Sequence, residues 1–183
     1  MSLIPYLYTA FYRYYSEGVP VVRPLVMDYP GIPELKDVYD SYMIGDGLLA
    51  APVIFGQGNR KTVYLPDGVW YNFNTGERIC GGRYISEDIP LDVIPLFVKE
   101  GTLLPLAEPL EHIPENAVFD VTLKAYGEGE CSCTLICDDG HTNAYRAGDI
   151  SEVTLTIRGE NVTSDRDHPG YRICAVAVSY THL

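Results

Sequence analysis

The chain opens with apolar residues spaced three and four positions apart. Within 3–17 they are Leu3, Ile4, Leu7, Tyr8, Phe11, Tyr14 and Tyr15. This spacing places them on one face of an α-helix, Gly18 is a typical stop, and Pro20 prevents continuation. The pattern therefore predicts a helix over 3–17. Its aromatic stripe could form a stacking platform, but we favour a helix face that packs on the outside of a barrel.

An almost uniformly apolar run, Val19 to Met27, follows this helix. It lacks alternation, so it predicts a parallel strand buried on both faces. Helix and strand together predict that residues 1–40 are the last αβ unit of an α/β barrel.

Two charged residues in this region are candidate site residues. Arg23 lies inside the apolar run, where a charge needs a partner, so we expect an internal ion pair and, as an alternative, a floor residue of an active site. Asp28 lies at the carboxyl end of the predicted strand, where barrel enzymes place working groups. A loop-capping or hydrogen-bonding role for Asp28 is favoured over a substrate-facing one.

After residue 40 the pattern becomes that of short strands. The apolar or alternating runs are 48–54, 61–65, 69–73, 83–85, 96–99, 119–123, 131–136 and 153–157. Gly, Pro, Asn or Asp fill nearly every gap, which is typical of antiparallel β-sandwiches. Prolines near 107–116 predict a boundary between domains 41–108 and 109–183. The predicted fold class is mainly β, with antiparallel β-sandwich domains preceded by the last helix and strand of a (β/α)8 barrel.

Composition narrows the function classes. A content of 46% hydrophobic and 21% charged residues is ordinary for a globular protein, and a net charge of −12 argues against nucleic-acid binding. No apolar run approaches the roughly 20 residues of a membrane span. Neutral or polar small molecules are the expected partners. Five cysteines without an even framework favour reduced thiols and a cytoplasmic location.

The cysteine spacing raises the question of a metal site. Cys131, Cys133 and Cys137 could share a zinc ion, but their parity, together with Leu135, predicts that they line one face of a strand as small hydrophobic groups. The following segment 138–143 is predicted to be a hairpin turn, because it lacks the ligand pattern of a calcium loop. We expect no metal and no cofactor.

Aromatic residues near turns offer a second kind of site. Trp70, Tyr71 and Tyr84 could stack on a sugar ring, although a core position for the tryptophan is favoured. A stand-alone carbohydrate-binding module, or a purely structural β-sandwich, is therefore kept as an alternative function.

Six segments, in the same order along the chain, carry a family resemblance. They are 3–8, 18–25, 42–53, 63–71, 74–76 and 95–101. Together they resemble the C-terminal part of glycoside hydrolase family 31, which comprises α-glucosidases, α-xylosidases and relatives.

The resemblance implies an enzyme with a catalytic barrel followed by a proximal and a distal β-sandwich domain. Such an enzyme hydrolyses terminal α-linked sugars with retention of configuration and without a cofactor. One aspartate attacks the anomeric carbon and a second protonates the leaving oxygen. No segment resembles either aspartate motif, so no catalytic residue is assigned and this chain alone is expected to be inactive. Arg23 and Asp28 remain as substrate-adjacent candidates.

Both ends of the chain bear on this interpretation. Met1 precedes a helix that the resemblance places deep inside the barrel domain, and residues 172–183 fit the distal-domain pattern poorly. We therefore expect a truncated gene product with a non-native tail. A strand without its barrel neighbours exposes apolar surface, so either association into a homo-oligomer or packing of the helix on the sandwich is expected.

Overall fold

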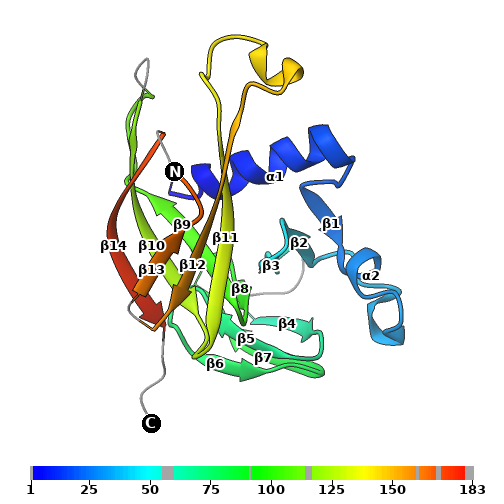
Figure 1. Cartoon of the computed structure of the whole chain (residues 1–183). Helices are drawn as coiled ribbons and strands as arrows, with labels where there is room; N and C mark the ends of the chain where they lie inside the picture. Colours follow the sequence, from blue (N-terminus) through cyan, green and yellow to red (C-terminus); the bar gives the residue numbers. More distant parts are fainter. Residues whose placement is uncertain are drawn as a thin grey trace. The chain divides into compact units, whose positions relative to one another are not determined.

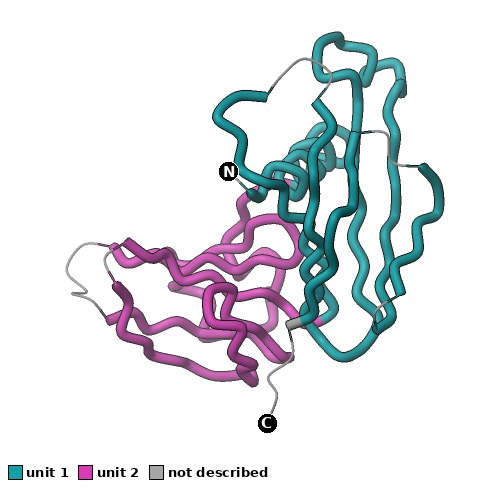
Figure 2. Tube along the Cα trace, turned by 90° about the vertical axis from the view of Figure 1, so that its left-hand side faces the viewer, with its two compact units in different colours: residues 1–19, 101–179 teal, residues 20–100, 180–183 magenta. Residues whose placement is uncertain are grey.

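The computed structural model describes residues 2–54, 60–90, 92–113, 117–159, 161–167 and 170–179. They form two compact units (Figure 2): unit 1 holds the described residues of 2–19 and 101–179, and unit 2 those of 20–100. These units do not follow the boundaries predicted at 40/41 and 108/109. The N-terminal helix groups with the C-terminal strands, and 20–40 group with the strands that follow. The barrel origin of residues 1–40 stays a prediction.

Helix α1 (Ile4–Glu17) confirms the helix predicted from the apolar spacing. Pro5 lies in its first turn, where a missing N–H costs no hydrogen bond. The helix ends at Gly18, which adopts a left-handed conformation with φ 74° and donates its N–H to the Tyr14 carbonyl at 3.0 Å. In unit 1, α1 contacts β9 (Thr102–Ala107) and β11 (Glu130–Cys137), as Figure 1 shows.

Unit 2 contains two antiparallel sheets. The larger has the order β1 (Val22–Pro24), β2 (Tyr42–Ile44), β3 (Leu48–Ala50), β8 (Leu96–Lys99), β5 (Val69–Asn72) and β6 (Arg78–Cys80). The smaller pairs β4 (Arg60–Leu65) with β7 (Arg83–Asp88). Both sheets, together with the short helices α2 (Leu25–Asp28) and η1 (Pro33–Leu35), contribute to one apolar cluster. Trp70 and Phe97 from the large sheet and Val63 and Leu65 from the small one share it, which is the packing of a β-sandwich.

The apolar run 19–27 differs from its prediction. The strand is shorter, lies at the sheet edge and pairs antiparallel with β2, so it is neither parallel nor buried on both faces. Val22 is 54% exposed, and Arg23 is the buried residue. Prolines explain the difference: Pro20 and Pro24 cannot donate to a ladder, which confines the strand to an edge, and α2 begins directly after Pro24.

Unit 1 is built on one sheet of six strands. Their order is β13 (Asn161–Ser164), β12 (Ser151–Arg158), β11, β9, β10 (Phe119–Tyr126) and β14 (Tyr171–Ser179). The pairs β10/β14 and β9/β11 are parallel and the others antiparallel. Val162 and Ile173, from the two edge strands, pack on the same cluster as Leu123 of β10 and Leu155 of β12, the strands next to the edges. The sheet therefore curls around a common core.

Each of the eight predicted strand runs overlaps an observed strand. The prediction missed β2, β6, β9, β13 and β14. Residues 172–179 of the expected non-native tail belong to β14, which pairs with β10 from Phe119 to Tyr126. Residues 180–183 lie outside the described residues, and the origin of the tail stays a prediction. No helix in the described part of the chain is long and apolar enough to cross a bilayer.

Candidate functional site

Arg23 is the centre of a polar network in unit 2. The residue is only 5% exposed, and its Nε donates to both oxygens of Asp28, at 2.8 and 3.0 Å. Its Nη1 donates to the Pro20 carbonyl at 3.0 Å, and Nη2 donates to the Gly45 carbonyl at 2.9 Å and to Asp46 at 3.1 Å. The predicted internal ion pair is confirmed.

The local fold explains this network. The single turn of α2 returns Asp28 to the strand that carries Arg23, and the β2–β3 turn brings Asp46 to the other side. Burial alone would lower the pKa of Arg23, but the two carboxylates outweigh it and raise that pKa. The guanidinium thus hydrogen-bonds to two carboxylates and two backbone carbonyls of unit 2. The substrate-adjacent roles of Arg23 and Asp28 stay predictions.

A second buried cation was missed from the sequence. Lys61 is 1% exposed, and its Nζ donates to the carboxylate and to the carbonyl of Asp40. The available signal was parity, because Lys61 shares the inward-facing positions of β4 with Val63 and Leu65. This pair ties the linker before β2 to the small sheet of the sandwich.

The three candidate stacking aromatics do not form one exposed platform. Trp70 is fully buried and donates its indole N–H to the Pro66 carbonyl at 2.8 Å, which confirms the favoured core position. Tyr71 is 2% exposed. Tyr84 alone of the three reaches solvent, at 56% exposure, with its ring packed edge-on against Tyr64.

The cysteines of β11 occupy the positions that their parity predicted. Cys131, Cys133 and Cys137 lie in or against the apolar cluster of unit 1, together with Leu135. Burial raises the pKa of Cys133 to about 12, which disfavours the thiolate that metal binding requires. In the ranges that the structure describes, no three His, Cys, Asp or Glu residues are grouped to hold a metal ion.

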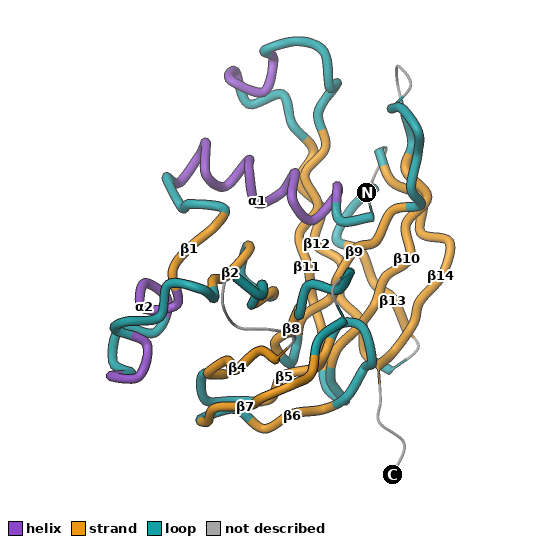
Figure 3. The backbone as a smooth tube through the Cα atoms, turned by 180° about the vertical axis from the view of Figure 1, so that it is seen from behind, coloured by secondary structure: helices purple, strands orange, loops and turns teal. Residues whose placement is uncertain are grey.

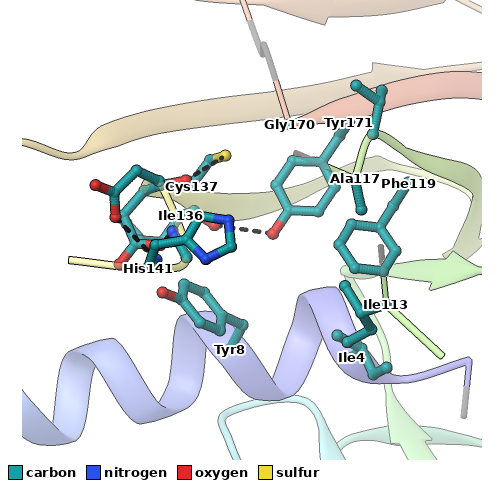
Figure 4. A pocket seen from close by; sticks show the side chains of 14 residues that line it. Ile4, Tyr8, Ile113, Ala117, Phe119, Ile136, Cys137, His141, Gly170 and Tyr171 are labelled. Atoms are coloured by element: carbon teal, nitrogen blue, oxygen red, sulfur yellow. Dashed lines mark hydrogen bonds between the residues drawn. The ribbon is translucent and has the colours of Figure 1, made fainter. Parts of the chain in front are cut away.

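A cavity of about 580 Å³ lies within unit 1 (Figure 4). Its lining comes from α1, from residues before and at the start of β10, from the end of β11 with the next loop, and from the start of β14. The lining residues are Ile4, Tyr8, Ile113, Ala117, Val118, Phe119, Ile136, Cys137, Asp138, Asp139, Gly140, His141, Gly170 and Tyr171. The Tyr171 hydroxyl donates to the Ile136 carbonyl at 2.8 Å and fixes one wall.

The loop that borders this cavity connects β11 to β12, so the predicted hairpin connection is confirmed. It is longer than a tight turn and contains the short helix η2 (Ala144–Ala147), visible in Figure 3. Asp139 accepts the N–H groups of His141 and Thr142 and the Thr142 hydroxyl. These bonds lower the pKa of Asp139 to about 2, so the group stays a carboxylate bound to its own turn.

Two tyrosines of the cavity wall have perturbed acidity. Burial, and then the neighbouring Asp138 carboxylate, raise the pKa of Tyr8. Burial, and then the neighbouring Cys137, Tyr8 and Asp138, raise the pKa of Tyr171. Asp138 therefore adds a negative electrostatic contribution at both tyrosines. Tyr8 belongs to the aromatic stripe of the predicted helix, but the sequence did not indicate that it meets Tyr171, because the two residues lie at opposite ends of the chain.

Comparison with known proteins gives the family. Residues 18–104 match the family described as glycosyl hydrolase family 31 C-terminal domain. The α-glucosidase 2 of Bacillus thermoamyloliquefaciens is 32% identical over 161 residues, covering 86% of this chain and 20% of the relative. The α-xylosidase of Saccharolobus solfataricus is 36% identical over 156 residues, covering 85% of this chain and 21% of the relative. The chain thus spans about a fifth of the length of these relatives.

A solved structure agrees with the sequence comparison. The family 31 dextranase of Flavobacterium johnsoniae, determined in complex with isomaltotriose, superposes with a TM-score of 0.85 at 29% identity. The match covers 100% of this chain and 24% of the dextranase. The chain therefore belongs to glycoside hydrolase family 31 and corresponds to the C-terminal part of its members.

Proposed function

We propose that this chain supplies the accessory β-sandwich domains of a retaining α-glycosidase, of α-glucosidase or α-xylosidase type, that hydrolyses terminal α-linked sugars. The observation that carries the proposal is the match of residues 18–104 to the C-terminal domain of family 31. The relatives by sequence include both an α-glucosidase and an α-xylosidase. The substrate of the complete enzyme would be an α-linked oligosaccharide or α-glycoside.

The surface of α1 supports an accessory role. Phe11, Tyr14 and Tyr15 are 59%, 57% and 50% exposed, although apolar side chains of this size are usually buried. A stripe of large aromatic side chains on one helix suits packing against another protein surface. In the complete enzyme the α1 stripe would pack against the barrel that carries the two catalytic aspartates.

The carboxylates of the unit 1 cavity do not supply an alternative catalytic pair. A retaining glycosidase needs one carboxylic acid that can give up a proton and one free carboxylate nucleophile. Both oxygens of Asp139 are bound within its turn, and its pKa is lowered to about 2. Asp138 accepts the N–H of Gly140 at 2.9 Å. Chain-alone hydrolysis is therefore not expected.

A chimaera tests the accessory role. The matching C-terminal part of the Saccharolobus α-xylosidase is replaced by this chain, and hydrolysis of p-nitrophenyl α-xyloside is measured. We expect activity from the chimaera and none from this chain alone. A second chimaera with Arg23→Ala should lose activity, whereas one with Arg60→Ala should keep it, since Arg60 is 66% exposed in its side chain.

A separate measurement distinguishes the alternative function. Isothermal titration of this chain with maltose, isomaltose and xylose-containing oligosaccharides should give no heat of binding. Saturable binding, combined with an inactive chimaera, would favour a stand-alone carbohydrate-binding module.

A further inference from the structure

The cavity of unit 1 has the size and lining of a ligand site. Its volume of about 580 Å³ falls in the range of roughly 300–1,000 Å³ that small-molecule pockets occupy. Figure 4 shows Ile4, Ile113 and Phe119 at one end and His141 and Cys137 at the other. Phe119 and Tyr171 form a pair of rings with centroids 6.1 Å apart.

The walls are held by contacts that do not depend on a ligand. The Tyr171 hydroxyl is bound to the Ile136 carbonyl, and the 138–142 turn is fixed by Asp138 and Asp139. On the α1 side, the Thr9 hydroxyl is within hydrogen-bonding distance of the backbone of β11. A ligand would therefore enter a largely formed cavity, which lowers the entropy cost of binding.

Charge decides which ligand suits the cavity. Its described lining residues include the carboxylates of Asp138 and Asp139 and the imidazole of His141, but no lysine or arginine. Burial and Asp138 already raise the pKa of Tyr8, so additional negative charge is disfavoured there. A neutral sugar is also a poor ligand, because most of the lining is apolar and would leave its hydroxyl groups without partners.

We propose that this cavity binds a small organic cation, an amine with an aromatic or alkyl body. The body would lie among Ile4, Phe119 and Tyr171, and the ammonium group would pair with Asp138. Tyr8 also lines the cavity, and its ring would attract a cation that lies over its π face. This site lies within unit 1 and does not depend on the proposed glycosidase function.

The probe is 2-phenylethylamine, compared with 2-phenylethanol and phenylacetate, which share its aromatic body. Binding to the full chain is measured at pH 7 by isothermal titration and by ligand-observed NMR. We expect the amine to bind about tenfold more tightly than the alcohol, and phenylacetate to bind weakest. Equal affinity for all three probes, or no binding of the amine, would overturn the proposal.

Variants locate the bound amine. Asp138→Asn should weaken amine binding about five- to tenfold and leave alcohol binding unchanged, whereas Ala117→Phe should fill the cavity and weaken both. Glu152→Gln removes an exposed carboxylate that is absent from the lining and should change neither. Each variant is first checked for a wild-type melting transition, and Asp138→Glu should restore affinity if Asp138→Asn disturbs the turn. Unchanged amine affinity in folded Asp138→Asn and Ala117→Phe would show that the amine binds elsewhere, contrary to the proposal.

Discussion

The Thr9 hydroxyl in α1 lies 3.2 Å from the backbone nitrogen of Ile136 and accepts its N–H. It also lies 3.2 Å from the carbonyl oxygen of Thr134, to which it can donate. In the described part of the chain β11 pairs with β9 at Ser132, nearer the start of β11. The Thr9 hydroxyl thus provides hydrogen-bond partners for two backbone groups of β11, the Thr134 carbonyl and the Ile136 N–H. These bonds anchor α1 to the sheet.

This relationship predicts that Thr9→Val destabilises unit 1. The isosteric change leaves the Ile136 N–H without its acceptor, which costs about 1–3 kcal/mol in the free energy of unfolding. Thr9→Ser keeps the hydroxyl and should lie close to the wild type. The free energies are measured by urea unfolding followed by circular dichroism.

The matched control is Ser16→Ala in the same helix. Ser16 is exposed and its hydroxyl bonds only one turn back, to the Tyr12 carbonyl at 3.0 Å. Its removal should change stability by less than about 0.5 kcal/mol. If Thr9→Val and Ser16→Ala had the same effect, the contact with β11 would contribute nothing.

The Arg23 network predicts a large effect of Asp28→Asn. A buried guanidinium that loses its main carboxylate partner keeps the cost of its desolvation, so the free energy of unfolding should fall by about 2–3 kcal/mol. Asp88→Asn is the control, because Asp88 is 81% exposed and lies 3.8 Å from Arg60; it should cost less than about 1 kcal/mol. A similar loss in both variants would mean that the Arg23 pair is no stronger than a surface pair.

Strands with a steady period could be predicted from the sequence, and strands with a broken period could not. In β12, Val153, Leu155 and Ile157 alternate without interruption and point into the core. In β14 the inward residues are Tyr171 and Ile173, and then Val176 and Val178, so the parity changes. A register shift opposite Val121/Thr122 of β10 places one extra residue in β14 and moves the following side chains to the other face.

The candidate sites show the same division. The ion pair of Arg23 was predictable because a charge in an apolar run needs a partner nearby, and Asp28 is five residues away. The cavity was not, because Tyr8 and Tyr171 meet only after the sheet has formed. Their side chains have no local signature, since either tyrosine could equally be an ordinary core residue.

Replacing Glu87 by glutamine is expected to stabilise the fold in a pH-dependent way. Burial raises the pKa of Glu87 above the usual 4.5, and Glu77 adds to the rise, although Asn72 donates to its carboxylate at 3.3 Å and opposes it. Above pH 4.5 the folded state therefore binds more protons than the unfolded state, and stability falls as pH rises through the folded pKa. Glu87→Gln removes the charge and should raise the free energy of unfolding at pH 7 by about 0.5 kcal/mol.

The measurement is the difference between variant and wild type in urea unfolding at pH 4 and pH 7. The difference should shrink at pH 4, where Glu87 in the folded protein is largely protonated. The exposed Glu152→Gln should show no such change. A difference that grew toward pH 4 would have the wrong sign for a raised pKa.

A side chain at Gly170 is expected to clash with Cys137, and a second substitution at Cys137 should relieve the clash. A Cβ at this position would lie 2.1 Å from the Cys137 sulfur, a distance that real side chains do not tolerate. Gly170→Ala should therefore lower the free energy of unfolding by about 1–3 kcal/mol through overpacking. Gly129→Ala is the control, because nothing lies within 4 Å of its added Cβ.

A double-mutant cycle separates this clash from a backbone effect. Cys137→Ala removes the sulfur, so Gly170→Ala should cost much less in that background, with a coupling of about 1 kcal/mol or more. Gly81→Ala gives the contrasting case, because its Cβ would meet the backbone oxygen of Pro66 at 1.9 Å and no side-chain deletion can make room. Strict additivity of Gly170→Ala and Cys137→Ala would mean that the two residues do not touch, and that the wall of the cavity is placed differently.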